Sequence, residues 1–202
     1  MNRVQPIRLA LGALSLGAIL ALAACGTPTK TLPAATATAP GSAPGPAYGK
    51  TTPGEFVWSP RMGSAESKLS SSLRGSGVQV AKTSDERLWL TLPGDQAFEP
   101  NRSALKPEAR QALDRIVMAV RDNPKAEFRI VGHTDANGSA AANNALSLDR
   151  AAATRDWLVA RGLSPIRMAV AGRGARDPVG SNADEAGRAS NRRVEILVGE
   201  RK

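Results

Sequence analysis

The chain has 202 residues, which is enough for one ordinary domain with appendages, and its single cysteine excludes an internal disulfide. Its formal charge is +9 at pH 7 and its pI is about 10.6, a balance that suits nucleic acid or an anionic surface. Aromatic residues make up only 3% of the chain, too few for the stacking platforms of single-strand binders. We therefore expect no nucleic-acid partner.

The first 24 residues have the pattern of an export signal. Arg3 and Arg8 form a basic head, and the apolar run that follows is too short for a confident membrane span. Its Leu-Ala-Ala-Cys ending resembles a bacterial lipoprotein signal, which implies that residues 1–24 are removed and that Cys25 is lipidated. Gly26 in place of aspartate then implies sorting to the outer membrane. An uncleaved anchor helix, or an ordinary signal with a chance cysteine, is the alternative. Because we expect the chain to be exported, an acidic polymer of the cell envelope is a better partner for it than nucleic acid. The other possibility is that its basic surface is merely solvated.

Composition divides the rest of the chain into three parts. Residues 25–54 are rich in proline, threonine, alanine and glycine, and they cannot bury enough surface to offset their ordering entropy, so we expect a disordered tether. Residues 55–76 form a short lead-in segment, in which apolar residues at four-residue spacing predict one short helix. These residues are Ala65, Leu69 and Leu73. The folded domain is expected to span residues 77–202.

Apolar periodicity predicts the elements of this domain in chain order. Alternating patterns predict strands at about residues 78–80, 88–92, 127–131, 166–170 and 194–198. A helical stripe after Pro107 predicts a helix that ends before Asn123. A second helix is expected from about Ala141 or Leu146 to Arg161. Strands that alternate with helices favour an α/β (α+β) sandwich, with a mixed sheet and helices packed on one face.

Three ordered blocks of polar and glycine residues follow this pattern. They are Gly132-His133-Thr134-Asp135-Ala136-Asn137-Gly138 with Asn143, then Leu146-Ser147-Leu148-Asp149-Arg150-Ala151, then Asn191-Arg192-Arg193-Val194-Glu195-Ile196. Together with Phe98, Ser103-Ala104 and Gly172-Arg173-Gly174, they resemble the OmpA-like peptidoglycan-binding domain over about residues 78–198. That family includes peptidoglycan-associated lipoproteins and flagellar stator subunits. The resemblance implies a βαβαβ-β order, an outer-membrane, lipid-anchored protein whose domain faces the periplasm, and noncovalent binding to peptidoglycan.

The resemblance places the two key ligand residues of the family at Asp135 and Arg150. Independently, Asp135 is expected on a loop just past a strand end and Arg150 on the next helix, so that a carboxylate and a guanidinium can face one small zwitterion. Diaminopimelate in the peptide stem ends in such an ammonium and carboxylate, and charge-assisted hydrogen bonds would hold it. The alternative is that Asp135 and Arg150 pair with each other, or that Asp135 caps a turn. Secondary candidates for the ligand site are Thr134, Asn143, the backbone near Leu146, and Glu99, which stands where many relatives have aspartate.

Other kinds of chemistry find little support in the sequence. His133 is the only histidine, and a zinc site would need several more ligands, so we expect no metal or cofactor and place His133 at a strand end as a hydrogen-bonded side chain. Ser139 and Ser147 have no partner base, so we expect no enzyme and no wall hydrolase. We expect Arg193 to bridge to acidic groups near the ligand loop and Arg192 to be solvated. A second possible function is an adaptor for a protein of a trans-envelope complex such as a Tol–Pal-like system, with Glu55–Gly77 as the partner surface.

Overall fold

The computed structural model describes residues 54–202 of the chain. The predicted signal, the predicted lipidation at Cys25 and nearly all of the predicted tether lie outside the described residues. Within residues 54–202 no helix has the length and apolar character needed to cross a membrane. The elements in chain order are β1 (Phe56–Val57), α1 (Pro60–Ser72), β2 (Gln79–Lys82), β3 (Arg87–Pro93), α2 (Gly94–Ala97), α3 (Pro107–Val120), β4 (Ala126–His133), α4 (Ala140–Ala160), the 3₁₀ turn η1 (Pro165–Arg167), β5 (Met168–Gly172), α5 (Glu185–Asn191) and β6 (Arg193–Arg201).

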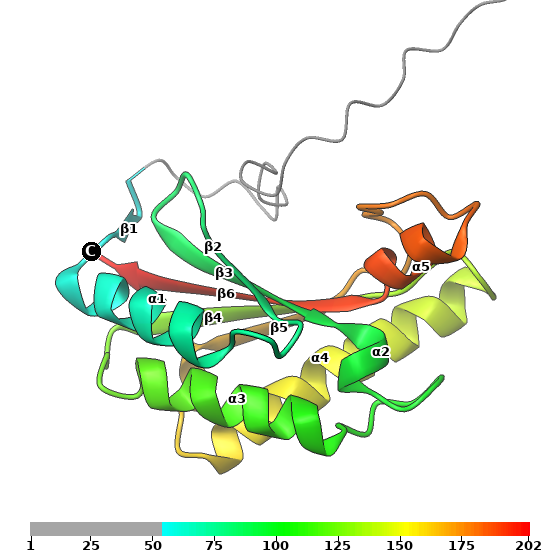
Figure 1. Ribbon diagram of the computed structural model, residues 1–202. Helices are drawn as coiled ribbons and strands as arrows, with labels where there is room; N and C mark the ends of the chain where they lie inside the picture. Colours follow the sequence, from blue (N-terminus) through cyan, green and yellow to red (C-terminus); the bar gives the residue numbers. More distant parts are fainter. Residues whose placement is uncertain (1–53) are drawn as a thin grey trace, which may run out of the picture. The chain divides into compact units, whose positions relative to one another are not determined.

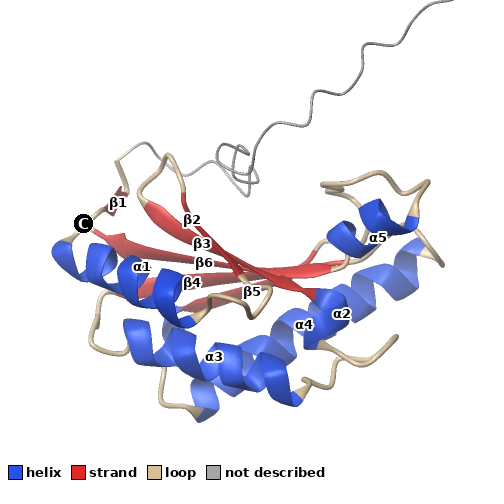
Figure 2. Ribbon diagram, in the orientation of Figure 1, coloured by secondary structure: helices blue, strands red, loops and turns tan. Residues whose placement is uncertain are grey.

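The strands form one mixed sheet in the order β2-β3-β6-β4-β5, with β1 paired to the end of β6. Only β4 and β5 run parallel, because α4 connects them as a crossover, and all the other pairs are antiparallel. Helices α1, α3 and α4 lie on one face of this sheet (Figure 2). The predicted mixed sheet with helices packed on one face is therefore confirmed.

The apolar core lies between the sheet and these helices. Alternate residues of β3 and β6 point to it, as the period of two in the sequence predicts, and the stripe on α3 packs against them. All of the following residues are at most 5% exposed: Leu88, Leu90, Leu92, Ala109, Leu113, Ile116, Val117, Val120, Val194, Ile196 and Val198. The stripe on α3 thus faces the core as expected.

Residues 55–76 are part of the same packed unit. The predicted helix exists as α1, and it buries Met62, Ala65 and Leu69 in the common core. Ser59 caps its first turn by accepting a hydrogen bond from the Met62 N–H, and β1 adds to β6. The expected start of the fold at residue 77 was therefore too late, because a four-residue apolar repeat shows a helix but not what the helix packs against.

Three smaller details differ from the sequence prediction. Ile166 does not begin a strand: it lies in η1 and is 92% exposed, and β5 starts only at Met168. The short helices α2 and α5 were not predicted, since four and seven residues are too few to show a helical period. Helix α4 begins at Ala140, close to the earlier of the two predicted starts, with Ser139 as its N-cap.

Two glycines let α4 lie very close to the sheet. A Cβ atom at Gly132 would stand 1.9 Å from the backbone oxygen of Ser147, and one at Gly172 would stand 2.7 Å from the Ser147 Oγ. Any side chain at these positions on β4 and β5 would push the helix away. The close crossing places Arg150, one turn further along α4, beside the loop that leaves β4.

Candidate functional site

A pocket of about 470 Å³ opens where β4 ends, at the end of the sheet where α2, α5 and the start of α4 gather (Figure 1). Its walls come from four segments: α2 with the loop after it, the loop after β4, the first half of α4, and the residue before β6. The lining residues are Asp95, Phe98, Pro100, Asn101, Thr134, Asp135, Asn137, Asn143, Leu146, Arg150 and Arg192. Segments from most of the domain's length therefore meet in this one pocket.

Asp135 lies in the first loop residues after β4 and is 8% exposed. One carboxylate oxygen, Oδ1, accepts a hydrogen bond from the Asn137 N–H at 3.0 Å, which makes a local turn. The other, Oδ2, accepts from the Arg192 Nη1 at 2.7 Å. The alternative that Asp135 caps a turn is thus correct as a description of Oδ1. Oδ2 faces a cation that is not Arg150.

Arg150 enters the pocket from α4 and is held by two contacts. Its Nε donates to the backbone oxygen of Arg102 at 3.0 Å, and its guanidinium carbon lies 5.2 Å from the centre of the Phe98 ring. Within residues 54–202 its two terminal nitrogens donate no hydrogen bond. Burial lowers the pKa of Arg150 and the charge of Arg192 adds to this, while the carboxylates of Asp95 and Asp135 oppose it. The group stays charged at neutral pH and is oriented by the protein.

Arg192 is the central ion-pairing group of the pocket, although we expected it to be solvated. Its guanidinium contacts three carboxylates, at 2.7 Å in Asp95, 2.7 Å in Asp135 and 2.6 Å in Glu185. The hydrogen bond to Asp95, together with those to Asp135 and Glu185, raises its pKa, and the same bond lowers the pKa of Asp95. The expectation that Arg192 would be solvated was therefore wrong, whereas Arg193 does pair with a carboxylate, that of Glu195.

Arg193 and its partners form a buried charge cluster beneath the pocket. Arg193 Nε donates to Glu195 Oε1 at 2.7 Å, and His133 Nε2 lies 3.7 Å from the same oxygen. All three residues are at most 3% exposed. Burial alone would raise the pKa of Glu195, but the contact from His133 and the charge of Arg193 lower it below its usual value. His133 is thus at the end of β4 in a polar cluster, and in the described part of the chain no three His, Cys, Asp or Glu side chains are grouped to hold a metal.

The second carboxylate of the pocket is Asp95 and not Glu99. Glu99 is exposed and does not line the pocket, because the chain turns after α2 and directs it outward. Asp95 lies one helix turn earlier on α2, and the Gly94 N–H donates to the Arg192 oxygen at 2.7 Å, which brings α2 to the pocket. The expectation for Glu99 is corrected in favour of Asp95.

The remaining predicted residues do line the pocket. Asn143 Nδ2 donates to the backbone oxygens of Asp135 and Asn137, so it holds the loop in shape. Thr134 anchors the loop from the other side through its N–H, which donates to Gly174 O at 3.0 Å. Leu146 is partly exposed and supplies an apolar wall. Of the six predicted ligand residues, the structure brings five to one pocket, with Glu99 outside it.

The alternation of apolar residues along β6 was a sequence signal that could have placed Arg192 and Arg193 on opposite faces of the sheet. Val194, Ile196 and Val198 face the helices, so Arg193 and Glu195 must share the opposite face and can pair there. Arg192 is two residues before Val194, so the same alternation places it on the face that the helices cover, where Arg150 lies. For Asp95 the sequence held no comparable pattern.

The four ionised groups of the pocket balance in charge, with carboxylates at Asp95 and Asp135 and guanidinium groups at Arg150 and Arg192. Such a pocket favours a small ligand that carries both an ammonium and a carboxylate over one with a net charge.

Comparison with known proteins gives the chain its family. The family model described as "OmpA family" matches residues 97–192. The chain is 33% identical over 133 residues to the probable lipoprotein YiaD of Escherichia coli (strain K12), which is 66% of this chain and 60% of that protein. It is 41% identical over 105 residues to the peptidoglycan-binding protein ArfA of Mycobacterium tuberculosis (strain ATCC 25618 / H37Rv), which is 52% of this chain and 32% of that protein. The chain thus spans less than two thirds of either relative.

Among solved structures, the chain is similar to the cell wall anchor of the T6SS from Pseudomonas aeruginosa. The two are 31% identical with a TM-score of 0.60, over 67% of this chain and 96% of the other. The match therefore includes nearly the whole of that anchor. The chain belongs to the OmpA family.

Proposed function

We propose that this protein binds peptidoglycan noncovalently, through the diaminopimelate of the peptide stem, and is a binding module and not an enzyme. The observation that carries the proposal is the meeting of Asp135 and Arg150 in one charge-balanced pocket. Membership in the OmpA family and the printed names of its relatives, a peptidoglycan-binding protein and a cell wall anchor, support the same conclusion.

Each end of diaminopimelate has a proposed partner. The side-chain carboxylate binds the two terminal nitrogens of Arg150, which Phe98 and the Arg102 oxygen already hold in place. The ammonium binds Asp135, whose Oδ1 is fixed by the turn to Asn137. Because a carboxylate oxygen accepts more than one hydrogen bond, the ammonium can share Oδ2 with Arg192. Arginine at position 150 supplies a planar fork that lysine could not replace.

We further propose that Cys25 carries a lipid that anchors the protein in the outer membrane, with residues 26–54 as the tether to the wall. The likeness to a probable lipoprotein supports this proposal. Many tethered copies then bind together, so that a weak individual interaction suffices. Labelling of cells with radioactive palmitate should mark the wild-type protein and not the Cys25→Ala variant. Equal labelling of both would remove the anchor from the proposal.

Calorimetric titration of the purified protein with a diaminopimelate-containing muropeptide tests the site. Asp135→Ala and Arg150→Ala should each lose about 2–5 kcal/mol of binding free energy, roughly 30-fold or more in Kd, because the ligand charge loses its partner. Arg155→Ala is the matched control: Arg155 lies on the same helix but pairs with exposed Asp156. If Asp135→Ala folds normally and binds as well as the wild type, the site assignment fails.

A lysine-containing muropeptide separates the two ends of the ligand. Its stem has the ammonium but lacks the side-chain carboxylate, so the wild type should bind it less tightly than the diaminopimelate form. Arg150→Ala should then weaken binding to the diaminopimelate form far more than to the lysine form, whereas Asp135→Ala should weaken both. An equal loss for the two ligands in Arg150→Ala would contradict the proposed role of Arg150.

A further inference from the structure

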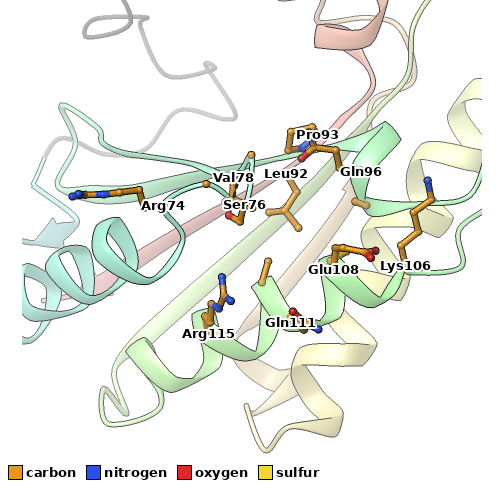
Figure 3. A pocket seen from close by; sticks show the side chains of 15 residues that line it. Arg74, Ser76, Val78, Leu92, Pro93, Gln96, Lys106, Glu108, Gln111 and Arg115 are labelled. Carbon is orange, nitrogen blue, oxygen red and sulfur yellow. Dashed lines mark hydrogen bonds between the residues drawn. The ribbon is translucent and has the colours of Figure 1, made fainter.

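Another hollow, of about 620 Å³, is lined by residues of α2 that do not line the ligand pocket, and Figure 3 shows its lining side chains. We call it the edge groove. It is bounded by the segment between α1 and β2, by the end of β3, by α2 and by the first half of α3. Asp95 of α2 lines the ligand pocket, while Gln96 and Ala97 line the edge groove. The two sites are thus neighbours that share a helix but no lining residue.

The edge groove has an apolar floor. Leu92 and Pro93 come from β3, Val78 directly precedes β2, and the small residues Ala109 and Ala112 come from α3. The chain that closes the groove contains Gly75 and Gly77, both with positive φ, so this wall carries little side-chain bulk. Val78 and Pro93 are the partly exposed members of this apolar set, whereas Leu92 is 1% exposed.

Cations dominate the rim. Arg74, Lys106 and Arg115 line the groove, against the single carboxylate of Glu108. Arg115 donates from Nη1 to the Ser72 oxygen, and its side chain rises from α3 toward the groove in Figure 3. Within residues 54–202 neither Arg74 nor Arg115 forms an ion pair with a carboxylate. With Lys106, these two charges give the rim an excess of positive charge over the single carboxylate of Glu108, so the rim is suited to a partner that brings its own acids.

The groove continues along the edge of the sheet. A neighbouring hollow shares four lining residues with the edge groove and extends to Val80 on β2. The shared residues are Arg74, Gly75, Gly77 and Val78. Strand β2 pairs with β3 on one side and is an outer strand of the sheet. Its other side therefore offers backbone N–H and C=O groups to an added strand.

We propose that the edge groove binds an extended, acidic peptide segment of a partner protein. The segment pairs its backbone with β2, places an apolar side chain over Val78, and brings carboxylates to Arg74 and Arg115. This site is separate from the proposed diaminopimelate pocket, so both ligands can bind at once. The edge groove is also a defined surface for the adaptor function that the sequence suggested. It includes the end of the segment Glu55–Gly77, which was the expected partner surface.

Fluorescence anisotropy with the purified full chain tests the proposal. The probe is a labelled octapeptide of alternating valine and glutamate, and its matched control has lysine in place of each glutamate. The glutamate peptide should bind and the lysine peptide should not. The double variant Arg74→Glu/Arg115→Glu should bind the glutamate peptide about tenfold more weakly or worse. Arg121→Glu, the same charge reversal at the far end of α3, should bind it as the wild type does.

Two further measurements distinguish this site from the ligand pocket. Hydrogen exchange of the amides in residues 78–82 should slow when the glutamate peptide binds, and Asp135→Ala should leave peptide binding unchanged. Equal binding of the two peptides, or loss of binding in Asp135→Ala alone, would overturn the proposal. So would displacement of the peptide by a muropeptide in a way that depends on Arg115, since the groove would then be a wall site. The double variant Arg74→Gln/Arg115→Gln repeats the test if the charge reversal unfolds the protein.

Discussion

The two ends of the sheet are built from different chemistry. Under β1 and the first part of β3, helices α1 and α3 bury mainly apolar residues, including Met62, Leu69, Leu113 and Ile116. The buried polar residues at this end are Arg87, Asn123 and Glu200. At the other end, where β4 stops and β6 starts, many of the buried residues are polar or charged. That set comprises His133, Thr134, Asp135, Asn143, Ser147, Arg150, Asn191, Arg193 and Glu195. The first end stabilises the fold mainly by apolar burial, whereas the second also requires that its larger set of buried charges stay paired.

This difference implies that one end of the sheet supplies stability and the other holds the ligand residues. A buried ion pair adds little net stability, because desolvation of its members offsets their attraction. The apolar end must therefore supply most of the stability that allows the polar end to hold Asp135 and Arg150 in fixed positions.

The largest loss should come from breaking the buried pair. Arg193→Ala leaves Glu195 buried without its closest cation, and we expect the free energy of unfolding to fall by about 3–5 kcal/mol. Urea denaturation at pH 7 measures it. The double variant Arg193→Met/Glu195→Leu should recover most of the loss, because it removes both charges. A loss below 1 kcal/mol in Arg193→Ala would show that the pair does not determine the stability of this end.

A comparable loss is expected at the apolar end, without any dependence on charge. Leu69 of α1 is 0% exposed, so Leu69→Ala should cost about 2–5 kcal/mol through lost burial and a cavity. Urea denaturation should show the same cost at pH 5 and pH 8. The neighbouring Ser70→Ala, at an exposed position, should change little. If Leu69→Ala behaves like Ser70→Ala, α1 is not part of the cooperative unit.

The crossing of α4 over the sheet connects the two ends, and Gly132 tests it. Gly132→Ala puts a methyl group against the Ser147 backbone, and we expect a loss of about 1–3 kcal/mol from overpacking. Because the helix must shift, muropeptide binding should weaken as well. Gly138→Ala is the contrasting variant: Gly138 has a positive φ but no atom within 4 Å of its Cβ position, so it should be strained without displacing α4. Unchanged binding in a folded Gly132→Ala protein would contradict the positioning role of the crossing.

The sequence was most informative where one physical rule acts alone. The stripe on α3 and the alternation of β3 and β6 follow from burial on one face, and both were predicted correctly. Asp135 and Arg150 were placed in one site by their positions after a strand and on the next helix. Their roles as ligand residues stay predictions.

The sequence failed where distant segments decide the outcome. Asp95 reaches the pocket only because Gly94 binds the Arg192 backbone, a contact between residues far apart in the chain. Arg192 was wrongly expected to be solvated, because its partners Asp95, Asp135 and Glu185 come from three other segments of the chain. The packing of α1 likewise depends on a surface that the rest of the domain creates.

The smallest effect on stability should come from Arg192, although it contacts three carboxylates. Two of the three pairs are partly exposed, with Asp95 53% and Glu185 66% exposed in their side chains, and Asp135, 11% exposed, keeps its hydrogen bond from the Asn137 N–H. Arg192→Gln should therefore cost only about 1 kcal/mol at pH 7. The hydrogen bond from Arg192 lowers the pKa of Asp95 below its ordinary 3.8. The contribution of this pair is therefore fully present above that value and is lost as the pH falls through the lower pKa of the folded protein.

Carboxyl NMR titration checks this prediction directly. In Arg192→Gln the pKa of Asp95 should rise toward its ordinary value, whereas in Arg188→Gln it should stay low, since Arg188 pairs with Glu185 and not with Asp95. An unchanged Asp95 titration in Arg192→Gln would mean that the ionic contacts around Arg192 do not form in solution. The pocket would then present Asp135 without a competing cation, and the ammonium of a ligand would meet a carboxylate held only by the turn to Asn137.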